Sequence, residues 1–551
     1  MHYTVTRRKK HYGAGGEEGA CMKDRPILKN KIYLYVTEFF AGVSVMAVEL
    51  GASRLLAPYF SSSQIVWTII IGTIMIALAL GNLWGGRRAD RDPDPDRLYR
   101  RILIAAVWIA AIPVLGKYVI LGISGLLVLT VNTHFLVLAA FFTCIIVFVF
   151  PLFLLGTVTP SLIKYTVSSL EASGRIAGAL GAANTVGSIL GTFLPTFVTI
   201  PTVGTAVTFL LFSGILLLIG LIYFISAGAK RILCLVTLVL FILCSIFGNG
   251  DSFAFWEKSL AYEGESVYNY LQVKDLDDRI ILSTNVLFGV QSVKMKTDAL
   301  TGMYYDTALA APVMAGLKEG GRVLILGNGT GTYASQCLRY FDGVSVTGVE
   351  IDRRISDLAY EYFDMPEAVE LVTYDGRAYL QAVDEKYDVI LVDAYQDITI
   401  PFQMSTMEFF TLARDHLTEN GALVVNMNMH SDGTGSINEA LCDTIAAVFP
   451  SVCTVDVTYS TNRELFAAAF DVRQALTENL SGVSDPELRN RMGGVLNRLI
   501  PYSGGRHVLT DDKAPVELLG MRVIDELIAD ELSYYKEIFR EQGVSGLLDA
   551  A

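Results

Sequence analysis

The chain has 551 residues, of which 52% are hydrophobic and only 18% are charged; this excludes a single ordinary water-soluble domain. Residues 1–250 carry 20 Lys or Arg and 10 Asp or Glu, whereas residues 251–551 carry 23 and 46. We therefore expect a basic, apolar first part and an acidic, water-soluble second part. The acidic excess of the second part argues against binding to nucleic acid. The seven cysteines form no C-x-x-C pair, which argues against a disulfide framework and a zinc site.

Residues 1–31 are basic and predict a cytoplasmic tail. A membrane-spanning helix needs about 20 mostly apolar residues, and residues 32–249 contain enough such stretches to predict a transmembrane helical domain of seven or eight spans. The stretches cover approximately 32–55, 64–86, 102–127, 134–158, 176–200, 203–226 and 232–248.

The number of spans decides on which side of the membrane the second part lies. Seven crossings from a cytoplasmic tail would place it outside the cell. Residues 102–133 are interrupted by Pro113 and Lys117 and could form two short crossings. We therefore favour eight crossings, or one re-entrant segment, either of which keeps the second part in the cytoplasm. The arginine-rich stretch 81–91 is predicted to be cytoplasmic. The small-residue stretch 177–191 predicts a close helix-packing face.

The second part changes to short alternating stretches. Residues 262–300 predict a small β subdomain with strands at 267–273, 279–283 and 290–295. Residues 301–551 alternate apolar strands with amphipathic helices, which predicts a Rossmann-like α/β domain with a parallel sheet. Its expected strands lie near 322–327, 344–350, 369–373, 387–393 and 421–427, followed by a hairpin over 452–459 and 463–470 and helices at 484–500 and 517–541.

Two strings at the ends of the first two strands indicate a nucleotide site. V-L-I-L-G-N-G-T-G-T runs from a strand through Gly327, Gly329 and Gly331 into a helix, and such glycines let the backbone approach a ligand closely. V-T-G-V-E-I-D ends the next strand with Glu350. A carboxylate in this position can accept hydrogen bonds from both hydroxyl groups of a ribose.

Two further acids follow the next strands. Asp375 and Gly376 lie in T-Y-D-G-R, where the carboxylate could accept from an adenine amine or simply cap the following helix. Asp393 ends Y-D-V-I-L-V-D-A-Y at the mouth of the central strand. Its carboxylate could orient or deprotonate an amine nucleophile, or could cap a loop.

These four strings, in this order and spacing, resemble those of the spermidine synthase (polyamine aminopropyltransferase) family. The whole chain is similar to membrane-anchored bacterial proteins of the fused transporter/spermidine synthase type. Ser266 to Asn269 is similar to the family's early S-x-Y-Q string, and Gln291 matches a later glutamine. The segment from Asp298 to Asp306 is similar to the family's D-E-x-x-Y-x-E segment.

The resemblance implies an α/β transferase domain of the S-adenosylmethionine-dependent type, with S-adenosylmethionine or its decarboxylated form as donor and no metal. It implies a catalytic role for Asp393, with Glu350 on the ribose and Asp375 on the adenine. Cofactor-binding positions would be Gly327, Gly329, Gly331, Glu350, Asp375, Gly376 and Gln291, and acceptor-binding positions would be Tyr304, Tyr305, Asp306, Tyr395 and Gln396.

Two departures concern the acceptor site. The family's G-G-G-D-G loop is G-N-G-T-G here, so that Thr330 replaces the acid that would face the aminopropyl amine. The family's D-S-S-D loop becomes Asp393-Ala394-Tyr395-Gln396, so that Gln396 replaces its second acid, with Asp397 one place on. We therefore keep three hypotheses: an aminopropyltransferase acting on a polyamine-like amine, an S-adenosylmethionine-dependent methyltransferase, and a transporter or sensor that binds a nucleotide or polyamine without turnover. We expect a multi-pass protein of the cell membrane, with a lipid bilayer as partner and the catalytic domain in the cytoplasm, and we leave open a homodimer.

Overall fold

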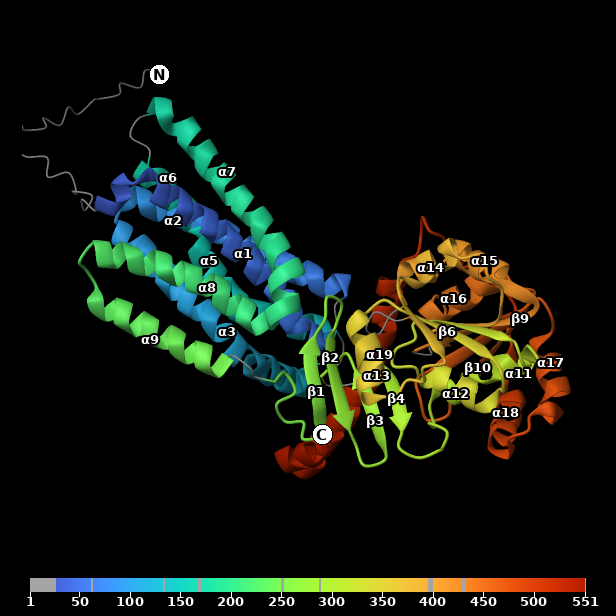
Figure 1. Cartoon of the computed structure of the whole chain (residues 1–551). Coiled ribbons are helices and arrows are strands. Elements are labelled where there is room, and N and C mark those ends of the chain that lie inside the picture. Colours follow the sequence, from blue (N-terminus) through green and yellow to red (C-terminus); the bar gives the residue numbers. More distant parts are fainter. Residues whose placement is uncertain are drawn as a thin grey trace, which may run out of the picture.

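The computed structural model describes residues 26–60, 63–131, 134–166, 170–248, 252–286, 289–394, 400–428 and 433–550. It consists of an elongated helical bundle joined at one end to a domain built on two β-sheets (Figure 1). The bundle contains the residues up to 248, and the sheets contain most of those that follow. The division agrees with the change in composition along the chain.

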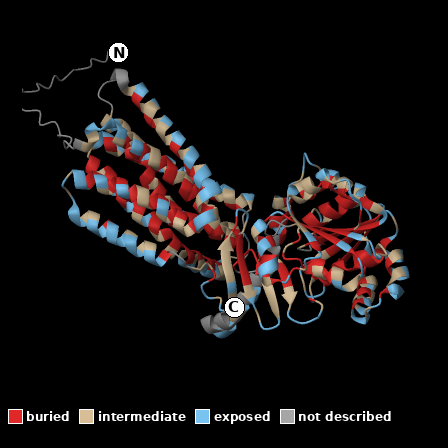
Figure 2. Cartoon of the chain, viewed as in Figure 1, coloured by how far each residue is buried: buried red, intermediate tan, exposed pale blue. Residues whose placement is uncertain are grey.

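The bundle contains six helical stretches that are long and apolar enough to cross a membrane. Their outward surface carries large apolar side chains, such as Ile76, Leu83 and Phe197, which are 60%, 60% and 66% exposed, and exposed residues alternate with buried ones along these helices (Figure 2). An apolar surface of this extent is unusual for a protein surrounded by water. The helices are α1 (Lys31–Phe60), α2 (Gln64–Arg91), α3 (Pro95–Thr130), α4 (Phe135–Cys144), α5 (Phe150–Gly156), α6 (Val158–Thr166), α7 (Leu170–Leu194), α8 (Ile200–Ser226) and α9 (Arg231–Gly248), with π-helical turns η2 (Ile145–Val149) and η3 (Pro195–Thr199).

The interpretation of residues 102–133 as two short crossings is wrong. α3 is one helix of 36 residues with Pro113 inside it. Lys117 does not break the helix, because its ammonium group donates to the carbonyl of Ser252 (3.2 Å) and lies 4.8 Å from the ring centre of Phe255. The apolar stretch 173–226, by contrast, counts as two passes, because the chain turns back at Gly204 (φ 80°). Among the described residues, seven helical runs therefore extend along the bundle: α1, α2, α3, α4 to α6, α7, α8 and α9.

Close packing between α1 and α7 depends on glycine. A Cβ atom at Gly187 would lie 2.1 Å from the carbonyl oxygen of Phe39, and one at Gly191 would lie 2.2 Å from that of Val43. Because any larger side chain would push the two helices apart, the predicted helix-packing face at 177–191 is confirmed for its second half. Its first half does not pack closely, since a Cβ atom at Gly178 or Gly181 would meet no atom within 4 Å.

The smaller sheet has four antiparallel strands in the order β1-β2-β3-β4. The sequence predicts three strands here and misses β1, which pairs with β2 through an irregular register between Leu260 and Tyr262. The strands are β1 (Leu260–Glu265), β2 (Tyr270–Asp275), β3 (Arg279–Ser283) and β4 (Ser292–Met295).

The larger sheet has the order β12-β10-β11-β9-β8-β5-β6-β7. Strands β5 to β9 are parallel, and β11 enters antiparallel beside β9. Helices cover both faces (Figure 1), as the alternating pattern predicts. The strands are β5 (Arg322–Leu326), β6 (Ser345–Glu350), β7 (Val369–Thr373), β8 (Tyr387–Val392), β9 (Leu417–Met427), β10 (Ser451–Asp456), β11 (Arg463–Ala468) and β12 (Ile500–Pro501).

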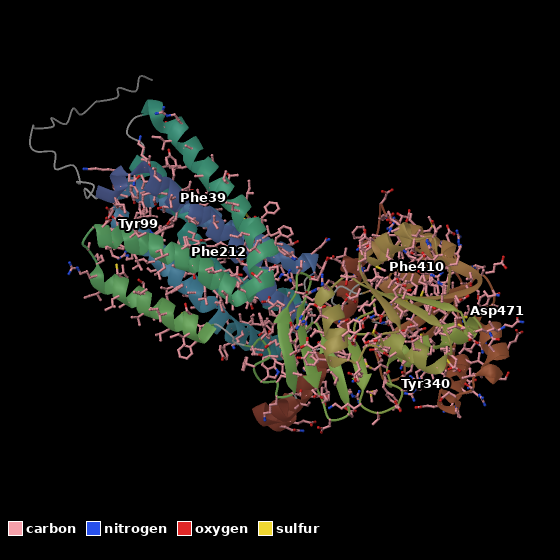
Figure 3. All side chains as sticks on the ribbon, in the orientation of Figure 1. Phe39, Tyr99, Phe212, Tyr340, Phe410 and Asp471 are labelled. Atoms are coloured by element: carbon pink, nitrogen blue, oxygen red, sulfur yellow. The ribbon has the colours of Figure 1, made fainter. Side chains whose placement is uncertain are left out.

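The covering helices of this sheet pack their apolar side chains onto it; Phe410, labelled in Figure 3, is fully buried. The helices are α10 (Tyr304–Ala308), α11 (Ala310–Met314), α12 (Thr332–Tyr340), α13 (Arg353–Tyr362), α14 (Gly376–Ala382), α15 (Met407–Asp415), α16 (Ile437–Ala446), α17 (Val472–Asn479) and α18 (Pro486–Arg498). The last helix, α19 (Val516–Ala550), packs instead against α16 and against α3 and α4 of the bundle.

The bundle and the sheet domain meet at the turn between β1 and β2. The carboxylate of Glu265 accepts hydrogen bonds from the amide (2.8 Å) and the hydroxyl (2.6 Å) of Thr205, which follows the turn at Gly204. The guanidinium group of Arg54 donates to the carbonyls of Ser266 and Val267. These contacts fix the turn between the end of α1 and the larger sheet.

Candidate active site

A pocket of about 230 Å³ lies where β5, β6 and β8 end and the smaller sheet approaches the larger one. Ligands bind at the carboxyl ends of parallel strands in open α/β sheets, so its position agrees with the expected site. Nine of the residues selected from the sequence line it: Gln291, Tyr304, Tyr305, Gly327, Gly329, Glu350, Asp375, Gly376 and Asp393.

The turn after β5 is possible only with glycine. Gly327 has φ of 90°, and a Cβ atom there would lie 2.4 Å from the carbonyl oxygen of Asp393. Gly329 has φ of 54°, and its Cβ would lie 2.4 Å from the hydroxyl oxygen of Ser292. The two glycines therefore allow β5, β8 and β4 to meet at the pocket.

Glu350 ends β6 and is 7% exposed. One carboxylate oxygen accepts from the amide of Gly329 (2.9 Å), and the other accepts from the amide of Asp352 (3.0 Å). Burial raises the pKa of Glu350 to about 7, against the opposing effect of these two amides. The carboxylate is thus held in one orientation and retains lone pairs for donors on a ligand.

Asp375 serves a structural purpose as well as lining the pocket. One of its carboxylate oxygens accepts from the amide of Ala378 (2.8 Å) and caps α14. The second oxygen is free to take part in the site, so that the two interpretations of Asp375 are compatible.

Three residues of interest do not line the pocket: Asp306, Thr330 and Gly331. Asp306 is 1% exposed and accepts from Thr301, Gly302 and Gln336, so the expected contact with an acceptor is not found: the side chain holds the turn before α10. Gly331 and Thr330 line a separate, more open cleft. Gly331 begins α12, with φ of 88°. Tyr395 and Gln396 lie outside the described residues.

Asp393 follows β8 and is oriented from two sides. The hydroxyl of Tyr304 donates to one carboxylate oxygen (2.6 Å), and the side-chain amide of Asn426 donates to the other (2.8 Å). Burial raises the pKa of Asp393 to about 7, although both hydrogen bonds lower it. A carboxyl group with this pKa can exchange a proton near neutral pH. The rings of Tyr304 and Tyr305 lie beside it, with centres 3.9 Å apart.

A polar group behind Asp393 is missing from the sequence-based selection. Asn462 donates to the side-chain oxygen of Asn426 (2.9 Å), and Glu464 is opposite Asn426 in the pairing of β9 with β11. Glu464 is fully buried. An acid within the otherwise apolar stretch E-L-F-A-A-A-F is the signal that could have identified it.

The turn between β1 and β2 connects the pocket to the bundle. Tyr268 and Asn269 line the pocket, and the hydroxyl of Ser266 donates to Asp352 (2.5 Å), next to Glu350. The residues that resemble S-x-Y-Q therefore contact the helical bundle on one side and the end of β6 on the other.

The family model and the curated relatives that match this chain point to the same family. Residues 303–468 match the spermine/spermidine synthase domain. The chain is 55% identical over 349 residues to a probable polyamine aminopropyl transferase of Bifidobacterium longum, covering 60% of this chain and 78% of that protein. It is 31% identical over 203 residues to a polyamine aminopropyltransferase of Oceanobacillus iheyensis, covering 34% of this chain and 38% of that protein.

The solved structures that match are more distant. A probable spermidine synthase from Corynebacterium glutamicum is 22% identical, with a TM-score of 0.35 over 45% of this chain and 97% of that one. A spermidine synthase in complex with the transition-state analogue AdoDATO is 19% identical, with a TM-score of 0.33 over 43% of this chain and 88% of that one. Among the described residues, no group of three or more His, Cys, Asp or Glu side chains is placed to hold a metal ion.

Proposed function

The chain belongs to the spermine/spermidine synthase family of aminopropyltransferases, and on that basis we propose that it transfers an aminopropyl group from decarboxylated S-adenosylmethionine to a polyamine-like amine. The nucleotide part of the donor occupies the pocket between the glycine turn and Glu350, with the ribose hydroxyls donating to that carboxylate. Asp375 receives the adenine amine.

The chemical step is a displacement at carbon. The lone pair of the acceptor nitrogen attacks the methylene carbon bonded to the sulfonium. The carbon–sulfur bond breaks with its electron pair on sulfur, which leaves 5′-methylthioadenosine. The new secondary ammonium loses a proton to Asp393. Since Tyr304 and Asn426 already donate to Asp393, its orientation is set before the acceptor binds.

The observation that carries the proposal is this buried carboxyl group, held by two donors at the end of the nucleotide pocket. Asp393→Asn keeps the shape and removes the proton acceptor, so turnover should fall by about 10²–10⁴-fold. The dissociation constant of 5′-methylthioadenosine, measured by calorimetry on the full chain in detergent, should stay near that of the wild type. Full activity in the variant would refute the role of Asp393.

We also propose that the helical bundle crosses a lipid bilayer. Its exposed apolar side chains and the lengths of its helices support this assignment. Most Lys and Arg residues of the bundle lie in helix ends and connecting loops at the end remote from the sheets, where Tyr99 lies (Figure 3). They are Lys29, Lys31, Arg87, Arg88, Arg91, Arg97, Arg100, Arg101, Lys164, Arg175, Lys230 and Arg231.

This charge distribution bears on the side of the membrane. Lys and Arg in short loops favour the cytoplasmic face. The opposite end of the bundle faces the sheet domain, which it contacts through Arg54, Val131, His134 and Thr205. The expected cytoplasmic position of that domain required eight crossings or one re-entrant segment. The continuous α3, with α7 and α8 taken as separate crossings, gives seven. We therefore place the transferase domain on the outer face, where donor and acceptor must also be supplied.

Cysteine labelling tests this orientation. Asp90 is exposed at the cationic end, and Glu487 is exposed on α18. In intact cells a membrane-impermeant maleimide should label the Glu487→Cys variant above the wild-type background. The Asp90→Cys variant should be labelled only after permeabilisation. The reverse pattern would place the transferase domain in the cytoplasm.

A further inference from the structure

Glu464 is a buried acid for which the proposed reaction as described has no use. It has no exposed surface, and neither carboxyl oxygen has a hydrogen-bond partner among the described residues. Buried carboxyl groups are costly unless they are paired or neutral, and an unsatisfied one in a native fold requires an explanation. Burial, together with the nearby charge of Asp393, raises the pKa of Glu464 well above its usual range.

The strand register places Glu464 in one row with Asp393. Val392 of β8 pairs with Val425 of β9, so that the next residues, Asp393 and Asn426, are neighbours. Asn426 in turn pairs with Glu464 of β11. Adjacent strands lie about 4.8 Å apart, so Asp393 and Glu464 are separated by two strand spacings, roughly 10 Å between backbones.

The three side chains also share a face of the sheet. Val424, two residues before Asn426, and Phe466, two residues after Glu464, belong to the same buried cluster as Tyr304. Because side chains alternate between faces along a strand, Asn426 and Glu464 project to the side where Tyr304 contacts Asp393. Asp393 and Glu464 therefore lie on the same face of the larger sheet, at the end where β8 and β9 finish.

We propose that Glu464 is a specificity-determining residue that binds the second ammonium group of the acceptor, across Asn426 from Asp393. This inference rests on the proposed function. It gives this chain a second acid for the acceptor although the catalytic loop's position for a second acid holds Gln396. The chemistry selected is an amine with two cationic ends.

The protonation states follow from the arrangement. In the acceptor-free protein burial without a neighbouring cation favours the neutral form of Glu464, which is why its pKa is raised. An arriving ammonium makes the carboxylate favourable, and Glu464 releases its proton to solvent. α10, which bears Tyr304, packs against β11, the strand that bears Glu464. The separation of Asp393 and Glu464 by two strand spacings then determines which distance between the two nitrogen atoms of the acceptor is favoured.

The test is acceptor binding to the full chain in detergent with 5′-methylthioadenosine already bound. Calorimetry with 1,4-diaminobutane should give a dissociation constant at least tenfold higher for Glu464→Gln than for the wild type. Butylamine, which has one ammonium, should bind both proteins equally. The exposed Glu487→Gln serves as the matched control.

Proton release provides a readout that a purely structural acid would not change. In two buffers with different ionisation heats, the wild type should release more protons per diamine bound at neutral pH than Glu464→Gln does. Glu464→Asp shortens the side chain by one methylene and should shift the preference from 1,4-diaminobutane toward 1,5-diaminopentane, which keeps the test valid if the Gln variant folds poorly.

The outcomes separate the two claims. If Glu464→Gln and Glu464→Asp bind the diamine as the wild type does, with equal proton release, Glu464 is only a buried structural acid and the inference fails. If the diamine results are as expected but no aminopropyl product forms with the wild type, the acceptor site stands and the proposed reaction fails.

Discussion

Tyr304 donates its hydroxyl hydrogen to Asp393 over 2.6 Å, and this contact joins the first helix after the small sheet to the central strand of the large one. The ring of Tyr304 is 5% exposed, and burial with the neighbouring charge of Asp393 raises the pKa of its hydroxyl well above the usual range. Tyr304 therefore remains a donor at physiological pH and stabilises the carboxylate form of Asp393.

Removal of this donor should move the pH dependence of catalysis. The proposed mechanism needs the carboxylate form of Asp393, whose pKa is about 7, so kcat/KM should fall as the pH drops below 7. Tyr304 lowers that pKa. In Tyr304→Phe the acidic limb of the kcat/KM profile should therefore lie at higher pH. An unchanged limb would show that the hydrogen bond does not act on the catalytic proton.

Nucleotide affinity should depend on Glu350. Glu350→Ala removes the acceptor for two ribose hydroxyls, which should weaken binding of 5′-methylthioadenosine by about 2–3 kcal/mol. Glu361→Gln, on the exposed face of α13, serves as the control. Calorimetric affinity that is equal in the two variants would exclude the ribose assignment.

The same carboxyl group makes nucleotide binding dependent on pH. Because burial raises the pKa of Glu350 to about 7, lowering the pH through 7 protonates it and removes acceptor capacity. The affinity of the wild type for 5′-methylthioadenosine should therefore decrease as the pH falls through this range. A pH-independent affinity in the wild type would indicate that the ribose does not use this carboxylate.

The boundary of an independently stable transferase fragment should lie before β1. Glu263 accepts from the amides of Phe253 (2.9 Å) and Ala254 (3.2 Å) and from the hydroxyl of Tyr270 (2.6 Å). A fragment that begins at Ser252 keeps these contacts, whereas one that begins at Ala261 loses the two amides and the first residue of β1.

Thermal unfolding followed by circular dichroism tests this boundary. Each kcal/mol of lost stability lowers the melting temperature by about 2–4 °C for a domain of this size, so the fragment from Ser252 should melt several degrees above the fragment from Ala261. Equal melting temperatures would show that residues 252–260 do not contribute to the fold.

The sequence predicts well those parts of the structure that are determined by residues close together in the chain. The strand, glycine turn and acid-tipped strand around Gly327 and Glu350 follow one another within 29 residues, from Arg322 to Glu350, and the fold brings them together as expected. β1 is missed because its irregular register with β2 leaves no regular alternation. The position of Asp306 could not be foreseen, because Gln336 on a different helix holds it inside the protein, away from the residues that line the pocket.

The row that contains Asp393, Asn426 and Glu464 could not be predicted for a different reason. It depends on the register between three strands, and a shift of one residue in β11 would move Glu464 to the other face. The arginine-rich loop 81–91 is informative about the membrane only once the number of passes is known, and that number depends on whether Pro113 breaks α3 or is accommodated within it.

The central claim, aminopropyl transfer, is tested most directly by the identity of the products. The full chain in detergent is incubated with 1,4-diaminobutane and either decarboxylated S-adenosylmethionine or S-adenosylmethionine, and the products are identified by mass spectrometry. We predict an aminopropylated amine and 5′-methylthioadenosine in equal amounts, formed only from the decarboxylated donor and lost in Asp393→Asn. A methylated amine and S-adenosylhomocysteine, formed from S-adenosylmethionine, would contradict the assignment.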